Sequence, residues 1–203
     1  MNLEELFLKG MREYSKMIDL LGKIFYLERE LPEQVFQSGY QRYFFEEFDW
    51  ATSSEFWGFI QTLSKETSDN YIFTAVLNLD SISYQFEEFG HFGSEILPVD
   101  LTGNDYFEFL DLGPKGNNAD SILSNSNIIV WASPSMKWGI FGERAYGTCI
   151  LAFSNDFKAT QSIRCLKSWK SVNQAIDMWI PLNFRNCIVP NEIINSFRKN
   201  YSF

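Results

Sequence analysis

The sequence has very little of the chemistry that most catalytic and metal sites use. Its 203 residues include one histidine, His91, which excludes metal sites built from several histidines. Any histidine-based catalytic triad would have to use this residue. Phosphate-binding loops, dinucleotide-binding glycine motifs and serine nucleophile elbows are absent as well. We therefore expect no cofactor, no metal and no locally encoded catalytic centre.

Cysteine and long apolar segments are also scarce. The three cysteines, Cys149, Cys165 and Cys187, are widely spaced and form no C-x-x-C pair, which predicts buried free thiols and no disulfide framework. No apolar run approaches the roughly 18 residues of a membrane span. The N-terminus carries Glu4 and Glu5, where a signal peptide needs basic residues. These features predict a cytoplasmic protein that does not act on a membrane.

Basic residues are rare in the middle of the chain. Residues 28–111 contain 17 acidic and 3 basic side chains, whereas residues 112–203 contain 5 acidic and 10 basic ones, and the whole chain has a formal charge of −9. A negative field repels nucleic-acid phosphates and anionic membranes, so direct nucleic-acid binding is not expected and a basic partner is favoured. The alternative is that the acidic residues only keep the protein soluble.

Aromatic residues, by contrast, are abundant. The chain has 20 Phe, 9 Tyr and 6 Trp residues, and 45% of its residues are hydrophobic. Aromatic side chains bury the largest area per residue, and 203 residues are enough for one sizeable core but few for two. The composition therefore predicts a single globular domain over residues 1–203.

The apolar periodicity predicts an α+β fold, a mainly antiparallel sheet flanked by N-terminal and C-terminal helices. Helices are predicted over residues 3–26, 55–65, 104–110, 158–179 and 190–197. Strands are predicted over residues 71–77, 95–101, 127–132, 137–141 and 148–153, and residues 40–48 suit a strand or a short bridging segment. The last three strands follow one another closely, which is typical of an antiparallel meander.

His91 is the centre of the one catalytic alternative. Glu88 and His91 would share a helix face if their segment were helical, yet a metal site would need further histidines and an acid–base site would need a nucleophile. Glu143 is the third candidate for an enzyme with a dispersed site. A polar loop residue is the simpler explanation of His91, so binding is favoured over catalysis.

Four segments resemble a known kind of protein. They are Phe48-Asp49-Trp50, the pair of Tyr84 and Phe89-Gly90, Ala119-Asp120-Ser121-Ile122, and the run over residues 129–144, which begins Ile129-Val130-Trp131. This pattern of aromatic and glycine positions, over residues 48–153, resembles bacterial immunity proteins encoded beside polymorphic or contact-dependent toxins. The resemblance implies a cytosolic protein that binds and neutralises a cognate toxin domain.

The resemblance also gives the acidic segment an expected role. Many such toxins are nucleases with basic clefts, and clustered carboxylates can imitate phosphates and steer association. The expected partner is therefore a basic toxin domain, such as a nuclease. The candidate binding residues are the carboxylates Glu46, Glu47, Asp49, Glu55, Glu87, Glu88, Asp105, Glu108 and Asp111. Nearby aromatic side chains would either anchor the partner or pack in the core: Tyr43, Phe44, Phe45 and Phe48.

Two alternatives to an immunity protein stay open at this point. The first is a regulatory or scaffold binding module that uses the same acidic surface without a dedicated toxin. The second is the enzyme with a dispersed site near His91.

Overall fold

A computed structural model describes residues 2–77, 86, 87, 89–113, 118–158, 166 and 168–202. The strands are β1 (Tyr40–Glu47), β2 (Tyr71–Val76), β3 (Ser94–Pro98), β4 (Ile128–Ala132), β5 (Trp138–Glu143) and β6 (Thr148–Ser154). The α-helices are α1 (Met11–Leu21), α2 (Phe48–Ala51), α3 (Ser54–Thr67), α5 (Gly103–Asp111), α6 (Ile122–Asn125), α8 (Val172–Met178) and α9 (Asn191–Tyr201). Short 3-10 segments are η1 (Leu3–Leu6), η3 (Asn118–Asp120), η4 (Arg144–Tyr146), η5 (Ile180–Asn183) and η6 (Arg185–Cys187).

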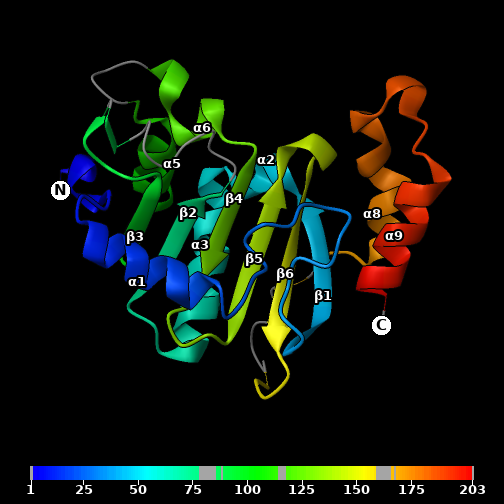
Figure 1. Cartoon of the computed structure of the whole chain (residues 1–203), viewed down its shortest axis with the longest axis horizontal. Helices are drawn as coiled ribbons and strands as arrows, with labels where there is room; N and C mark the ends of the chain where they lie inside the picture. The colour runs from blue at the N-terminus through cyan, green and yellow to red at the C-terminus, as the bar shows by residue number, and fades with distance from the viewer. Residues whose placement is uncertain are drawn as a thin grey trace.

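The strands form one antiparallel sheet in the order β1-β6-β5-β4-β2-β3. This confirms the predicted α+β fold with an antiparallel sheet and helices at both ends of the chain (Figure 1). The predicted meander is also confirmed, because β4, β5 and β6 are consecutive in the chain and adjacent in the sheet. Residues 40–48 belong mainly to β1, the edge strand beside β6.

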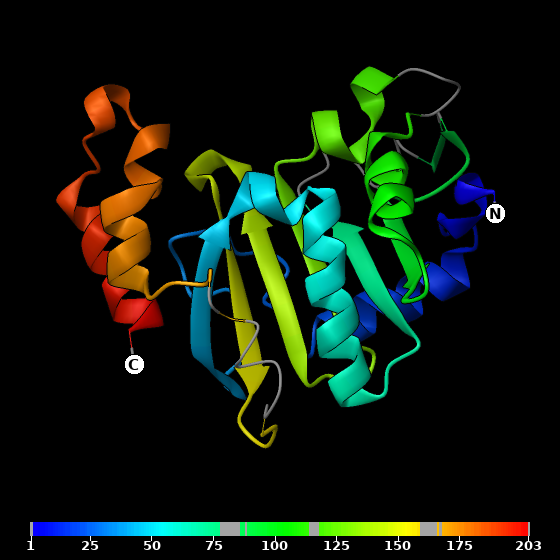
Figure 2. The ribbon, with the colours of Figure 1, turned by 180° about the vertical axis from the view of Figure 1, so that it is seen from behind.

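Both faces of the sheet are buried, which explains the continuous apolar sequence of β4. Successive side chains of a strand point to opposite faces. Ile129 and Trp131 pack in the core on the side of α3 and α5, whereas Val130 packs on the opposite side, in the core of α1, α8 and α9. Figure 2 shows α3 and α5 in front of one face, and Figure 1 shows α1 crossing the other, with α8 and α9 beyond β1.

The prediction of one long N-terminal helix was wrong. The chain forms η1, then an extended link, and α1 begins only at Met11. Phe7 is bridged to Glu95 of the edge strand β3, and the Leu8 N–H donates to the Ser94 carbonyl at 2.9 Å. An edge strand exposes unpaired backbone groups that favour an extended partner. Backbone pairing with β3 therefore interrupts a segment whose apolar spacing is otherwise helical.

The predicted helix over residues 158–179 was wrong at residues 168–171 for the same reason, and residues 159–165 and 167 lie outside the described residues. Within the described residues, α8 begins only at Val172. The preceding Lys170 is extended, and its N–H and carbonyl both pair with Phe45 of β1 at 2.8 Å. Both edge strands are therefore covered by short extended segments from near the two ends of the chain.

The cysteine prediction is correct for one residue and wrong for another. Cys149 is a buried free thiol on β6, but the free thiol of Cys187 is exposed in η6, and Cys165 lies outside the described residues. Within the described part of the chain, no helix has the length and apolar character required to cross a membrane.

Candidate functional site

The short helix α2 carries acidic side chains at one end of the sheet. Phe48 is buried, its N–H donates to the Gly147 carbonyl at 3.1 Å, and the Arg144 guanidinium lies 4.8 Å from its ring centre. Because Phe48 points inward, its neighbours Glu47 and Asp49 are exposed. The nearby Arg144 donates to main-chain carbonyls at 2.7 and 2.9 Å, and among the described residues it forms no ion pair with either carboxylate. The fold thus presents two uncompensated carboxylates beside a fixed turn.

The other end of α2 is held from the core. The Trp131 Nε1–H donates to the Tyr106 hydroxyl at 3.1 Å, and that hydroxyl donates to the Ala51 carbonyl at 2.8 Å. All three residues are fully buried, and the Trp57 ring stacks on Tyr106 at 4.7 Å. Burial raises the pKa of Tyr106 well above its usual value, which keeps the donating proton in place. This chain of hydrogen bonds connects β4 and α5 to the acidic turn.

The starts of α3 and α5 bring two more carboxylates to this end. A Cβ atom on Gly103 would lie 2.3 Å from the Ser54 carbonyl oxygen, so the two helix starts are in direct backbone contact. Glu55 is exposed in the first turn of α3, where hydrogen bonds from backbone and Ser53 groups lower its pKa. The Asp105 carboxylate accepts the Thr102 N–H at 2.9 Å in a capping box, and hydrogen bonds to Thr102 lower its pKa. Both groups therefore cap helices as well as carrying charge.

The predicted carboxylates fall into groups with different environments. Glu47, Asp49, Glu55, Glu87 and Glu108 are exposed, while Asp105 and Asp111 are half-buried. Glu47, Asp49, Glu55 and Asp105 lie at the end of the sheet described above. Glu87 belongs to another region, since the adjacent Phe86 stacks on Phe92 at 4.8 Å before β3, and Glu88 lies outside the described residues. The nine candidates therefore do not form one patch.

Glu46 differs from the other candidates because its side chain is buried. Strand alternation turns it toward the face that holds its register partner Cys149, while Glu47 turns outward. One carboxylate oxygen accepts the Glu47 N–H at 3.1 Å, and the other has no hydrogen-bond partner among the described atoms. Glu46 thus cannot act as part of an exposed rim.

The aromatic residues proposed as anchors are also placed in the interior. Tyr43, Phe45 and Phe48 are buried, and Phe44 is half-buried against the core on the α3 side. Core packing is therefore the observed role of this group. The exposed carboxylates Glu47, Asp49 and Glu55 are named the acidic end from here on. A partner of the acidic end would need apolar contacts from another part of the chain.

The acidic end is not neutralised by ion pairs within the described structure. Among pairs in which both residues are described, one ion pair lies within 4.0 Å. It joins the Lys137 Nζ to the Asp156 carboxylate at 2.9 Å. Glu47, Asp49 and Glu55 therefore keep their charge available for a partner. Exposed charges of one sign attract oppositely charged molecules over about 10 Å at 0.1 M salt.

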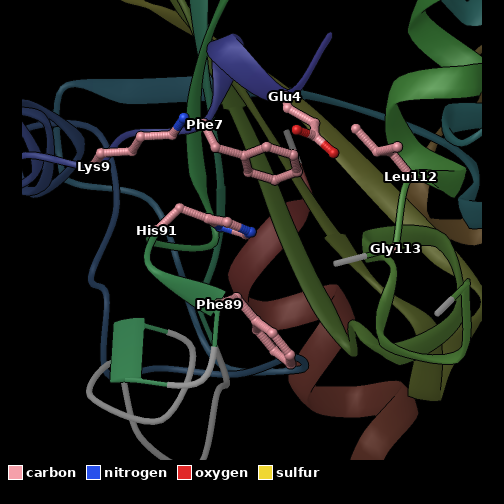
Figure 3. Close-up of a pocket in the computed structure, with 7 residues that line it drawn as sticks. All are labelled: Glu4, Phe7, Lys9, Phe89, His91, Leu112 and Gly113. Atoms are coloured by element: carbon pink, nitrogen blue, oxygen red, sulfur yellow. The ribbon is translucent and has the colours of Figure 1, made fainter. Parts of the chain in front are cut away.

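His91 lines a cavity of about 240 Å³ at the opposite edge of the sheet (Figure 3). The cavity is lined by Glu4, Phe7, Lys9, Phe89, His91, Leu112 and Gly113. The imidazole stacks on Phe7 at 4.2 Å, and its Nδ1 lies 3.1 Å from the Phe92 carbonyl oxygen. Burial lowers the pKa of His91, which favours a neutral ring whose Nδ1–H donates to that carbonyl. The described lining offers no hydroxyl or thiol nucleophile beside it.

The other two residues of the dispersed catalytic site do not join His91 in the described structure. Glu143 lies on β5, separated from β3 by β4 and β2, and its carboxylate accepts the Leu31 N–H at 2.7 Å. Glu88 lies outside the described residues. Among the described residues, no group of three or more His, Cys, Asp or Glu side chains could hold a metal ion.

No protein-family model, curated protein or solved structure matches this chain. The geometry of its own residues must therefore carry the functional argument.

Three exposed apolar residues were not singled out in the sequence. Met178, Leu182 and Ile188 are 54%, 69% and 69% exposed, at and beyond the end of α8. The sequence contains one relevant signal, because Pro181 marks the end of a helix before Leu182. It gives no indication that Ile180 is buried whereas Leu182 is exposed.

Proposed function

We propose that this protein is a cytosolic immunity protein that binds and neutralises a basic toxin domain through the acidic end of its sheet. The observation that carries the proposal is the group of exposed, uncompensated carboxylates Glu47, Asp49 and Glu55 around α2 and the start of α3. This group is the acidic end described above. The choice of an immunity role follows the resemblance seen in the sequence of residues 48–153.

The physical basis of the proposal is electrostatic complementarity. A toxin that cleaves nucleic acid needs a basic cleft to hold phosphates. Carboxylates on the turn carry negative charge, as phosphates do. They therefore accelerate the encounter with such a cleft. The hydrogen bonds of Phe48 and Tyr106 hold the turn in place before binding, which reduces the entropy lost on association.

The first prediction reverses charge at the acidic end. The double variant Glu47→Lys, Asp49→Lys should associate with the probe, the product of the gene immediately upstream, about 10- to 100-fold more slowly than the wild type at low salt. The difference should shrink as salt rises, because the Debye length falls from about 30 Å at 0.01 M to about 3 Å at 1 M. Stopped-flow or surface-based kinetics at several salt concentrations, together with protection of cells from the toxin, measure this effect.

A matched control is available at the other end of α3. Asp100 is exposed in the turn after β3, near the C-terminal end of α3, where the Val99 N–H bonds the Asn70 carbonyl. Comparing Asp100→Lys with Glu47→Lys separates a local effect from a change in net charge. Equal rates for the wild type and the double variant at every salt concentration would refute the acidic-end mechanism. A regulatory module with no dedicated toxin would instead bind a partner without silencing any toxic activity.

A further inference from the structure

The tip of the helical pair α8–α9 carries an unusual concentration of exposed apolar side chains. Met178 ends α8, Leu182 lies one turn later in η5, and Ile188 follows η6. Between Met178 and Leu182, Trp179 and Ile180 are buried, and the Trp179 Nε1–H donates to the Thr148 hydroxyl at 3.2 Å. These contacts fix the start of the tip on the sheet, so the exposure of Leu182 belongs to an anchored segment. Large apolar side chains that are held outward in this way mark interaction sites.

The backbone of the tip has an unfavourable conformation that presents Ile188. Asn186 and Cys187 have φ angles of 59° and 55°, so two consecutive non-glycine residues occupy the left-handed region. Non-glycine side chains rarely adopt this conformation, and strain of this kind is concentrated at binding and active sites.

The tip is adjacent to the acidic end through a shared contact at Gly147. The Phe48 N–H donates to the Gly147 carbonyl at 3.1 Å on one side. On the other side, a Cβ atom on Gly147 would lie 2.3 Å from the Asn183 Nδ2. Gly147 therefore contacts both the residue between Glu47 and Asp49 and the residue after Leu182. Figures 1 and 2 agree, since the turn after β5 lies between α2 and the upper part of the α8–α9 pair in both views.

We infer that Leu182 and Ile188, together with Met178, form the apolar anchor for the same basic protein domain that the acidic end attracts. This inference rests on the proposed function and names the part of the interface that the carboxylates do not supply. Interfaces combine a desolvated apolar centre, which sets the dissociation rate, with charged groups that set the association rate. The acids beside the tip select the occupant: Glu47 and Asp49 flank Phe48, which contacts Gly147, and they attract a basic domain.

The test replaces the anchor and measures both rate constants. With the product of the gene immediately upstream as the probe, the double variant Leu182→Ser, Ile188→Ser should dissociate at least about tenfold faster, with an almost unchanged association rate and an unchanged salt dependence. Leu182→Met, which keeps apolar volume, should retain wild-type binding. The matched control is Met11→Ser, a change at an apolar residue that is 60% exposed on α1.

The outcomes separate the anchor from the proposed function. An unchanged dissociation rate in the double variant, with wild-type thermal stability, would overturn the anchor and leave the acidic end intact. Faster dissociation of the serine variant combined with an insensitive Glu47→Lys, Asp49→Lys variant would support the anchor and overturn electrostatic steering. Failure of the wild-type protein to bind the probe at any salt concentration would overturn both proposals.

Discussion

Replacing Tyr106 by Phe is expected to lower the free energy of unfolding by about 2–4 kcal/mol, because it leaves two buried groups without a partner. The Tyr106 hydroxyl accepts the Trp131 Nε1–H and donates to the Ala51 carbonyl. Neither group can reach water, since all three residues are fully buried. Removing one hydroxyl thus adds the desolvation cost of both groups, while the ring contact with Trp57 remains. Urea unfolding at constant pH measures the loss.

A second substitution isolates the hydrogen-bond contribution. In Tyr106→Phe, Trp131→Phe, the stranded N–H of Trp131 is gone, so the loss should be smaller than the sum of the two single losses, by about 0.5–3 kcal/mol. Trp57→Phe is the matched control, because the Trp57 Nε1 has no hydrogen-bond partner among the described atoms and its removal breaks no bond there. A Tyr106→Phe protein within about 0.5 kcal/mol of the wild type would show that the hydroxyl does not hold α2.

The strands of the sheet could be predicted because their apolar content is a local signal. The residues of β4, Ile128–Ala132, are all buried, and a short β-branched run bounded by turn residues indicates such a strand. The link at Phe7 and the segment at Lys170 could not be predicted in the same way. Each has helical apolar spacing, but each supplies backbone hydrogen bonds to an edge strand that is distant in sequence. The residues of these two segments contain no local signal for pairing with a distant edge strand.

The sequence could predict the charge of the candidate site but not which of its side chains face solvent. Glu46 and Glu47 are adjacent and chemically alike, yet one is buried beside Cys149 and the other is exposed, because the end of β1 determines which side chain turns outward. Similarly, Ile180 is buried in the core that includes α1, α8 and α9, whereas Leu182, two residues later in η5, is exposed. The approach of Asn183, next to Leu182, and Phe48, next to Asp49, through their shared contact with Gly147 requires the folded structure.

The second large effect is a pH dependence of the free energy of unfolding, and it comes from Glu95. The carboxyl group of Glu95 is fully buried on β3. Neither carboxyl oxygen has a hydrogen-bond partner among the described atoms, and the hydroxyl of its register partner Thr74 also has none. Burial raises the pKa of Glu95 well above its usual value, since a buried charge without a partner is strongly disfavoured. Glu95 is therefore protonated in the folded protein at pH values where it is ionised in the unfolded chain.

The folded protein should consequently lose stability as pH rises above the unfolded pKa. Below about pH 4, both states carry the proton, and Glu95 contributes no pH dependence. Above that value the unfolded state loses its proton while the folded state retains it, which destabilises the fold by about 1.4 kcal/mol per pH unit until the folded pKa is reached. Glu143 adds a loss of the same sign up to its own pKa, which burial raises to about 7.

Glu95→Gln should remove this contribution, so its stability should fall less steeply than that of the wild type between pH 5 and 8. Burying an amide is expected to shift the free energy of unfolding by an amount that does not depend on pH, because an amide does not titrate. The difference between the two proteins in the slope of this free energy against pH therefore gives the contribution of Glu95. Glu143→Gln is the matched control: its difference from the wild type should grow up to about pH 7 and then level off. Urea unfolding across this pH range measures both differences. Parallel curves for the wild type and Glu95→Gln would mean that the Glu95 carboxyl ionises as readily in the fold as in the unfolded chain, which its burial on β3 makes unfavourable.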